Sequence, residues 1–368
     1  MGKIEETVAS PERRLSKLAV LTMGERNSRG IPVTLRIGEE GRLPSTEISG
    51  RLPNPPRKII EHLPIYQSAY RGGTIGRLEA VASQVTNVSI TDTSEILNIS
   101  MNKWLKSESF RSIRETLLAK LTAEDEVRVV IQTRDTQLCR LPWYAWDLFE
   151  RYPKSQLALS ASMYDRVTSI KTSKDRIKIV AILGSDTGIN LEKDRKILEK
   201  LPNAETYFVV KPKREELMEQ LWEQQPYDIL YFAGHSCTEG EKGRLYINET
   251  DSVTIGDLKH PLRKAISQGL QLGIFNSCDG LGLAQELASL QIPQVIFMGE
   301  PVPDRVAQEF LKYFLQAFAT GKPLYLSVRE ARERLTGVEY QFSRASWLPI
   351  IYQNLAASPP NWNQLCSS

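Results

Sequence analysis

The sequence has little of several features that define simple classes of protein. Only four cysteines and three histidines occur among 368 residues, and no two cysteines have the C-x-x-C spacing. So few cysteines in a chain of this length do not make a disulfide framework, which favours a reducing compartment. No metal-ligand set is visible. We therefore expect a cytoplasmic protein that uses no metal and no cofactor.

Long apolar runs and an excess of one charge are also lacking. No stretch approaches the roughly 20 apolar residues that a transmembrane helix needs. The first residues carry acids where a secretory signal needs an apolar run. The 47 Lys and Arg residues nearly balance the 44 Asp and Glu residues, so the net charge is only +3. This balance gives no electrostatic case for nucleic acid. We expect neither a membrane nor a nucleic acid as partner.

The composition that is present is that of an ordinary globular protein, with 41% hydrophobic and 25% charged residues. A chain of this length exceeds what one hydrophobic core usually serves, so two domains are expected. A polar stretch at 167–176 suits a surface connection. We predict an N-terminal α+β module over residues 1–170, a second domain over 171–357 and a tail over 358–368.

The first half has a mixed pattern. Residues 38–77 are rich in Gly and Pro and are predicted to run over the surface as loop. Helical spacing is present over 95–121, with a break near Ser107. Apolar runs predict strands at 17–23, 33–37, 81–89, 127–133 and 156–161.

The second half alternates strand and helix. Short apolar runs, typical of strands buried on both faces, occur at 177–183, 205–210, 229–233, 272–275 and 294–298. Helical patterns lie between and after them, at 191–201, 214–223, 254–267, 283–290, 303–319 and 324–335. This alternation implies right-handed crossovers and a parallel sheet. The predicted fold class is α/β, with a mostly parallel sheet flanked by helices.

Two residues that can do chemistry follow successive predicted strands. His235 follows 229–233, and Cys278 follows 272–275. Function gathers beyond the carboxyl ends of parallel strands, and neighbouring strands lie about 4.8 Å apart. An imidazole can take the proton of a thiol, whose ordinary pKa is about 8.5, and so produce the nucleophilic thiolate. We predict that His235 is a base and Cys278 a nucleophile.

The surroundings of Cys278 support this interpretation. The positive end of the helix predicted to begin near Leu283 would favour a thiolate. Gly280 and Gly282 allow a tight turn that leaves backbone N–H groups free. The N–H groups of Cys278 and Ser236 are therefore candidates for an oxyanion hole. The glycines do not form the G-x-G-x-x-G pattern and follow the fourth strand, which argues against dinucleotide binding.

These residues resemble the CHAT family, caspase-like domains often found with helical repeat proteins in bacteria. The family shares a fold class with caspases, metacaspases, separases and gingipains, whose signature is a His after one strand and a Cys after the next. The matching segments are Tyr231-Phe-Ala-Gly-His-Ser236 and Asn276-Ser-Cys-Asp-Gly280. His235 and Cys278 are 278 − 235 = 43 positions apart, close to the roughly 50 of caspases. Segments similar to a subgroup common in cyanobacteria are Leu141-Pro-Trp143, Glu300-Pro-Val-Pro-Asp304, Val328-Arg-Glu-Ala-Arg332 and Trp347-Leu-Pro349.

The resemblance implies a cysteine endopeptidase with a protein or peptide substrate and a role in defence, programmed death or signalling. It also implies an activating protein partner or cleavage that reorders the active-site loops, for which the polar segment 238–244 is a candidate. The substrate pocket is expected near Asp186 and at Asn276, with Asp279 beside them. An acid there would favour Lys or Arg in the substrate.

Two residues depart from the family pattern. Many members have Gly where this chain has Ser236, whose Cβ could crowd the oxyanion site. Asp279 would raise the pKa of the thiol if its side chain pointed inward.

Three alternatives stay open. The first is a catalytically inactive protein of the same fold that acts as a signalling scaffold. The second is a cysteine hydrolase or acyltransferase that leaves peptides intact. The third is a flavodoxin-like signalling domain in which His235 and Cys278 are not coupled. The reactivity of the Cys278 thiol tests the first alternative. A panel of esters and amides tests the second, and the effect of substituting His235 on thiol reactivity tests the third.

Overall fold

The computed structural model describes residues 16–71, 84–166, 175–223, 226–239, 242–278 and 280–366. Its main strands are β1 Lys17–Met23, β2 Ile31–Glu39, β3 Thr46–Leu52, β4 Val127–Gln132, β5 Ser155–Ser160, β6 Ile177–Leu183, β7 Ala204–Val210, β8 Ile229–Ala233, β12 Leu272–Asn276, β13 Gln294–Met298 and β14 Pro349–Gln353. A second, small sheet contains β9 Ser236–Glu239, β10 Lys242–Tyr246 and β11 Ser252–Thr254. The helices are α1 Arg57–Arg71, α2 Gln84–Leu105, α3 Arg111–Lys120, α4 Thr136–Cys139, α5 Leu148–Arg151, α6 Leu191–Glu199, α7 Arg214–Glu223, α8 Lys259–Ser267, α9 Leu281–Ser289, α10 Asp304–Phe318, α11 Leu324–Arg334 and α12 Trp362–Cys366.

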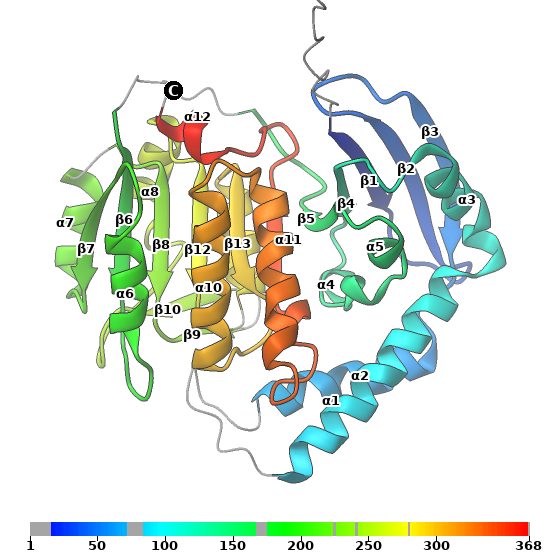
Figure 1. Ribbon diagram of the computed structural model, residues 1–368, viewed down its shortest axis with the longest axis horizontal. Helices are drawn as coiled ribbons and strands as arrows, with labels where there is room; N and C mark the ends of the chain where they lie inside the picture. The colour runs from blue at the N-terminus through cyan, green and yellow to red at the C-terminus, as the bar shows by residue number, and fades with distance from the viewer. Residues whose placement is uncertain are drawn as a thin grey trace, which may run out of the picture.

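Within the described ranges, eleven strands form one sheet in the order β3-β2-β1-β4-β5-β14-β13-β12-β8-β6-β7. Strands β13, β12, β8, β6 and β7 are mutually parallel, and β14 pairs antiparallel with β13. Helices α6, α10 and α11 cover the face of the sheet that is turned to the viewer in Figure 1. The predicted fold class, a mostly parallel sheet flanked by helices, is therefore confirmed.

Local sequence explains why these strands are central. Strands β8, β12 and β13 are buried along their whole length, as expected for apolar runs covered on both faces. Helix α10 buries an apolar stripe at helical spacing, in which the rings of Phe310, Phe314 and Phe318 stack with centroids 5.9 and 5.3 Å apart. No helix in the part of the chain that the structure describes is long and apolar enough to cross a bilayer.

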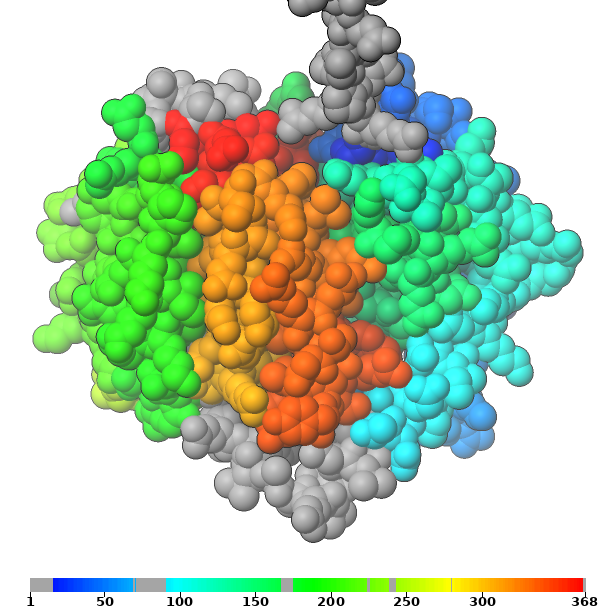
Figure 2. Space-filling model, viewed as in Figure 1, coloured from blue at the N-terminus to red at the C-terminus, as the bar shows by residue number. Residues whose placement is uncertain are grey.

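The two predicted halves contribute contiguous blocks to this one sheet. Strands β1 to β5 form one block, and the later strands form the other. They join where Leu159 of β5 pairs with Tyr352 of β14. Arg329 of α11 strengthens the joint, because its guanidinium donates hydrogen bonds to the carbonyls of Ser155 and Phe149. The surfaces of both blocks meet at α11 (Figure 2), and the buried side chains form one cluster. The division near residue 170 stays a proposal, and it would refer to these two blocks.

Three predicted segments differ from what the structure contains. Residues 84–89 of the predicted strand 81–89 belong to α2, while 81–83 lie outside the described residues. The predicted loop 38–77 contains β3 and α1. Residues 238–239 and 242–244 of the predicted loop 238–244 belong to β9 and β10, while 240–241 lie outside the described residues. Gly, Pro and polar content indicated loops at the last two, but β3 pairs with β2, and β9 pairs with β10.

Candidate active site

His235 and Cys278 leave the same edge of the sheet at equivalent positions. Strands β8 and β12 are parallel neighbours, and Ala233 pairs with Asn276 at their carboxyl ends. His235 and Cys278 each lie two residues beyond this pair. His235 is half-buried and Cys278 is only 2% exposed. The fold thus brings together the two loops that carry the predicted base and nucleophile.

The imidazole of His235 is oriented by a backbone carbonyl. Its Nε2 lies 2.9 Å from the carbonyl oxygen of Thr187. Because a carbonyl only accepts hydrogen bonds, Nε2 carries the proton and Nδ1 of the neutral ring carries the lone pair. Nδ1 is buried and has no hydrogen-bond partner among the described residues. The neutral ring is therefore held in the tautomer whose Nδ1 can take a proton.

The loop that presents Thr187 is fixed from two sides. At its start, Gly184 allows a close approach, since a Cβ at this position would lie 2.3 Å from the carbonyl oxygen of Tyr246. At its end, the Asp304 carboxylate accepts a hydrogen bond from the backbone N–H of Asn190 at 3.3 Å. These contacts come from β10 and α10. They position the carbonyl that orients His235.

Ser236 connects the histidine loop to the cysteine loop. Its side chain is buried, its Oγ is 2.9 Å from Ser277 Oγ, and its hydroxyl also bonds to the carbonyl oxygen of Cys278. The preceding Gly234 has a φ of +149°, which residues with a side chain rarely adopt. This glycine lets the chain turn out of β8 so that Ser236 contacts both residues.

The backbone N–H of Ser236 points away from the neighbouring strand β10. Tyr246 donates its N–H to the carbonyl of His235 at 3.0 Å, and Ser236 pairs with Leu245. Hydrogen-bonded and non-hydrogen-bonded pairs alternate in an antiparallel ladder, so the Ser236–Leu245 pair is of the second kind. The N–H predicted as an oxyanion donor is therefore not used in the ladder.

The sulfur of Cys278 lies under the loop that follows β13. We call residues 299–303 the cover loop. The backbone N–H of Val302 donates to Cys278 Sγ at 3.4 Å, and Sγ lies 3.8 Å from the Val302 carbonyl oxygen. Both backbone polar groups of Val302 therefore lie against the thiol. The sequence contained a signal for this loop, the two prolines of Glu300-Pro-Val-Pro-Asp304 directly after a strand, but it did not indicate that the loop covers Cys278.

The predicted pocket residues have different surroundings. Asp186 forms an ion pair with Lys211 at 2.6 Å, and Lys211 also pairs with Glu249 at 2.7 Å. The hydrogen bonds to Asp186 and Glu249 raise the pKa of the Lys211 ammonium. Asn276 is 2% exposed, its Nδ2 lies 3.3 Å from the Tyr231 hydroxyl, and its Oδ1 has no partner among the described residues. Asp279 lies outside the described residues.

The remaining cysteines and histidines do not gather around this site. Cys139 is buried, and burial raises the pKa of its thiol to about 12. The Cys237 sulfur lies 3.6 Å from the Tyr246 hydroxyl. His62 is on α1, where its Nδ1 lies 2.9 Å from the carbonyl of Lys58. No cluster of three potential metal ligands exists within the described ranges.

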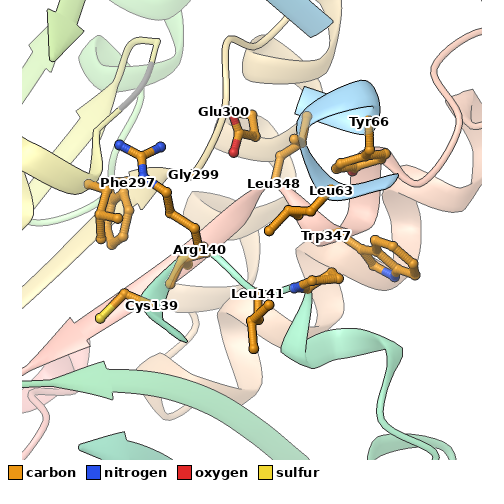
Figure 3. A pocket seen from close by; sticks show the side chains of 13 residues that line it. Leu63, Tyr66, Cys139, Arg140, Leu141, Phe297, Gly299, Glu300, Trp347 and Leu348 are labelled. Atoms are coloured by element: carbon orange, nitrogen blue, oxygen red, sulfur yellow. The ribbon is translucent and has the colours of Figure 1, made fainter. Parts of the chain in front are cut away.

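A cavity of about 40 Å³ is lined by residues of α1 and of the cover loop. Figure 3 shows Leu63 and Tyr66 of α1 on one side and Gly299 and Glu300 on the other. Three of the segments that carry the subgroup resemblance contribute to its wall, through Leu141 and Pro142, Glu300, and Trp347 and Leu348. These segments therefore build the contact between the N-terminal residues and the cover loop.

Together, the mixed sheet, the adjacent strands and the two loops define an α/β protein of the caspase-like fold class. A family model described as "CHAT domain" matches residues 107–363, so the chain belongs to that family. The match begins within the first block of the sheet. Membership of the cyanobacterial subgroup stays a prediction.

Among solved structures, the chain is similar to a chain of the Saccharomyces cerevisiae separase–securin complex, with a TM-score of 0.57 and 12% identity. The similarity covers 91% of this protein and 30% of that chain, so this protein spans less than a third of it. At this identity the likeness concerns the fold alone. A comparison with curated proteins finds no match.

Proposed function

We propose that this protein is a cytoplasmic cysteine endopeptidase in which His235 is the general base and Cys278 is the nucleophile. The observation that carries the proposal is the bond between His235 Nε2 and the Thr187 carbonyl, because it leaves Nδ1 able to accept a proton. The equivalent positions of His235 and Cys278 after two paired strands support it further. The substrate is a protein or peptide.

The reaction follows from these atoms. Nδ1 of His235 takes the proton of the Cys278 thiol as the sulfur attacks the carbonyl carbon of the scissile bond. The carbonyl oxygen becomes an oxyanion, to which the N–H groups of Ser236 and Cys278 donate. His235 then gives the proton to the leaving amine, and the C–N bond breaks to leave a thioester on Cys278. His235 then takes a proton from water as the water oxygen attacks the thioester carbon, the C–S bond breaks to release the carboxylic acid product, and His235 returns the proton to the Cys278 sulfur.

Substrate selection is assigned to Asn276, Asp186 and Asp279. Asn276 offers a buried acceptor oxygen without a partner among the described residues, and such an atom gains most from a donor on the substrate. Lys and Arg side chains carry donors and would also be attracted to the carboxylates. We therefore assign a preference for a cationic residue before the cleaved bond.

The test is a peptidyl electrophile with Arg next to the reactive group, offered to the purified full chain. The labelled residue is located by mass spectrometry, and cleavage of Arg and Lys peptides is measured in parallel. Cys278→Ala and His235→Ala are compared with the control variants Cys237→Ala and His260→Ala. His260 is an exposed histidine on α8. We expect label at Cys278, and at least a hundredfold slower labelling in His235→Ala.

The peptidase proposal fails if Cys278 is labelled equally fast with and without the His235 imidazole. It also fails if esters and small amides are turned over while every peptide stays intact. Turnover of esters and small amides alone would instead favour the alternative of a cysteine hydrolase or acyltransferase.

A scaffold without catalysis is the second candidate, because Cys278 is 2% exposed and its sulfur lies against Val302. A peptide carbonyl has to reach that sulfur before any reaction. The two candidates separate when the cover loop is displaced. A peptidase then cleaves peptides, whereas a scaffold leaves them intact. An activating protein partner that displaces the loop would fit the first candidate.

A further inference from the structure

The cover loop is held by α1, a helix more than 200 residues earlier in the chain. Gln67 of α1 donates from Nε2 to Oε1 of Glu300 at 2.6 Å. Glu300 is buried, and it lies two residues before Val302, whose N–H bonds to the Cys278 sulfur. One side chain of α1 is therefore linked to the residues that cover the thiol.

A second route runs from α1 through the segment before β14. The Tyr70 hydroxyl donates to the carbonyl of Ser343, and the ring of Tyr66 lies 5.8 Å from that of Trp347. Both tyrosines are buried. The segment that they contact, residues 343–348, leads directly into β14.

That segment in turn holds the start of the cover loop. The carbonyl of Leu348 accepts the N–H of Gly299 at 2.8 Å. Within the segment, Arg344 has a φ of +58°, a strained conformation for a residue with a side chain. Such strain persists where surrounding contacts impose it. Here they include the ion pair of Arg344 with Glu95 of α2 at 3.1 Å. Loss of the contacts from α1 and α2 would let the segment relax and carry Gly299 with it.

Helix α1 itself is suited to move. Pro64 lies inside it and provides no N–H for a helical hydrogen bond. The cavity of about 40 Å³ lies between α1 and the cover loop, so the contact is incompletely packed. Ile60 and Ile65 leave 58% and 45% of their surface exposed.

We propose that α1 is an autoinhibitory latch for Cys278. In the closed state, Gln67, Tyr66 and Tyr70 hold the cover loop over the sulfur. When α1 leaves, the loop is released and the thiol becomes accessible. The inference rests on the proposed function, since it describes regulation of that site. Its test, however, needs only the accessibility of the thiol.

The test changes the charge that faces Glu300. Gln67→Glu places a second carboxylate against Glu300 and should open the latch, whereas Gln67→Lys places a cation there and should close it. Alkylation of Cys278 by iodoacetamide is followed by mass spectrometry in the full chain. We expect labelling about tenfold or more faster than wild type in Gln67→Glu, and no faster than wild type in Gln67→Lys.

Ser68→Glu is the matched control, because Ser68 is the next residue of α1 and is exposed. It adds the same charge without facing Glu300 and should leave the labelling rate at the wild-type value. The double variant Gln67→Glu/Glu300→Gln removes the repulsion and should restore slow labelling. Thermal melting confirms that each variant is folded. If Gln67→Glu is unfolded, Tyr70→Phe takes its place, because it removes the hydrogen bond to the Ser343 carbonyl. Faster labelling of Cys278 than in the wild type then supports the latch, and an unchanged rate overturns it.

Equal labelling of Cys278 in wild type, Gln67→Glu and Gln67→Lys would overturn the latch. Cleavage of peptides by such proteins would leave the proposed function intact. Conversely, fast labelling in Gln67→Glu without peptide cleavage, and without any effect of His235→Ala, would support the latch and overturn the peptidase. The two proposals therefore fail in distinguishable ways.

Discussion

Ser236 Oγ lies 2.9 Å from Ser277 Oγ, and this contact ties the residue after His235 to the residue before Cys278. The same hydroxyl bonds to the Cys278 carbonyl. A glycine at this position would offer neither contact. In this chain one buried side chain therefore links the two loops beyond the paired strands.

Removal of that hydroxyl should weaken both the fold and the site. We expect Ser236→Ala to lower the free energy of unfolding by about 1–2 kcal/mol, because it leaves buried polar groups without their partner. Urea unfolding followed by circular dichroism measures this change. Ser289→Ala, which removes an exposed hydroxyl bonded to the Glu286 carbonyl, should change stability much less. Similar losses of unfolding free energy in both variants would contradict the role assigned to the Ser236 hydroxyl.

Asp304 should act on catalysis through Thr187. Its carboxylate holds Asn190, at the end of the loop whose carbonyl orients His235. We expect Asp304→Ala to lower kcat about tenfold with little change in KM, because the base is misplaced while the substrate pocket is kept. Asp304→Asn keeps an acceptor oxygen and should recover most of the activity. A loss confined to KM would show that Asp304 serves binding instead.

Lys211 should weaken the selection of cationic substrates. It pairs with Asp186 and thus offsets the negative charge assigned to the pocket. We expect Lys211→Met to raise the ratio of kcat/KM for Arg over Gln peptides several-fold. Lys213→Met, which removes an exposed cation two residues away, is the control. An unchanged ratio of kcat/KM would show that Asp186 is not part of the substrate pocket.

Alkaline pH should destabilise the α1 contact. Burial raises the pKa of the Tyr70 phenol far above its ordinary value, with a further contribution from the charge of Glu339. The folded chain keeps this proton above about pH 10, whereas the unfolded chain loses it. The contribution of Tyr70 to stability is therefore fully present below about pH 10 and is lost as the pH rises further, by about 1.4 kcal/mol per pH unit.

The variant Tyr70→Phe isolates this effect. Its free energy of unfolding at neutral pH should be lower by about 1 kcal/mol, since the hydrogen bond to Ser343 is lost. Between about pH 10 and pH 11, however, it should fall less steeply than that of the wild type. Tyr340→Phe, at a position that is 70% exposed, should keep the wild-type slope. Urea unfolding at each pH provides the comparison.

Much of the fold could be predicted from the sequence. The predicted strands at 17–23, 177–183, 229–233 and 294–298 coincide with β1, β6, β8 and β13. Each is a short, mostly apolar run, which is a local property of the chain. Their alternation with amphipathic helices predicted a parallel arrangement, which puts His235 and Cys278 at the same edge of the sheet. Whether the two strands are neighbours was left open by the sequence, and the structure shows that β8 and β12 are adjacent.

The tertiary structure alone decided how the site is covered and held. The joint between β5 and β14, the helix α1 and the position of the cover loop rest on contacts between residues far apart in sequence. Gln67 and Glu300 are 233 positions apart, and neither residue type indicates a partner. Periodicity and composition report only which face of an element is apolar, because side chains at the same periodic spacing lie on one face. Which distant surface buries it depends on the packing of the whole chain.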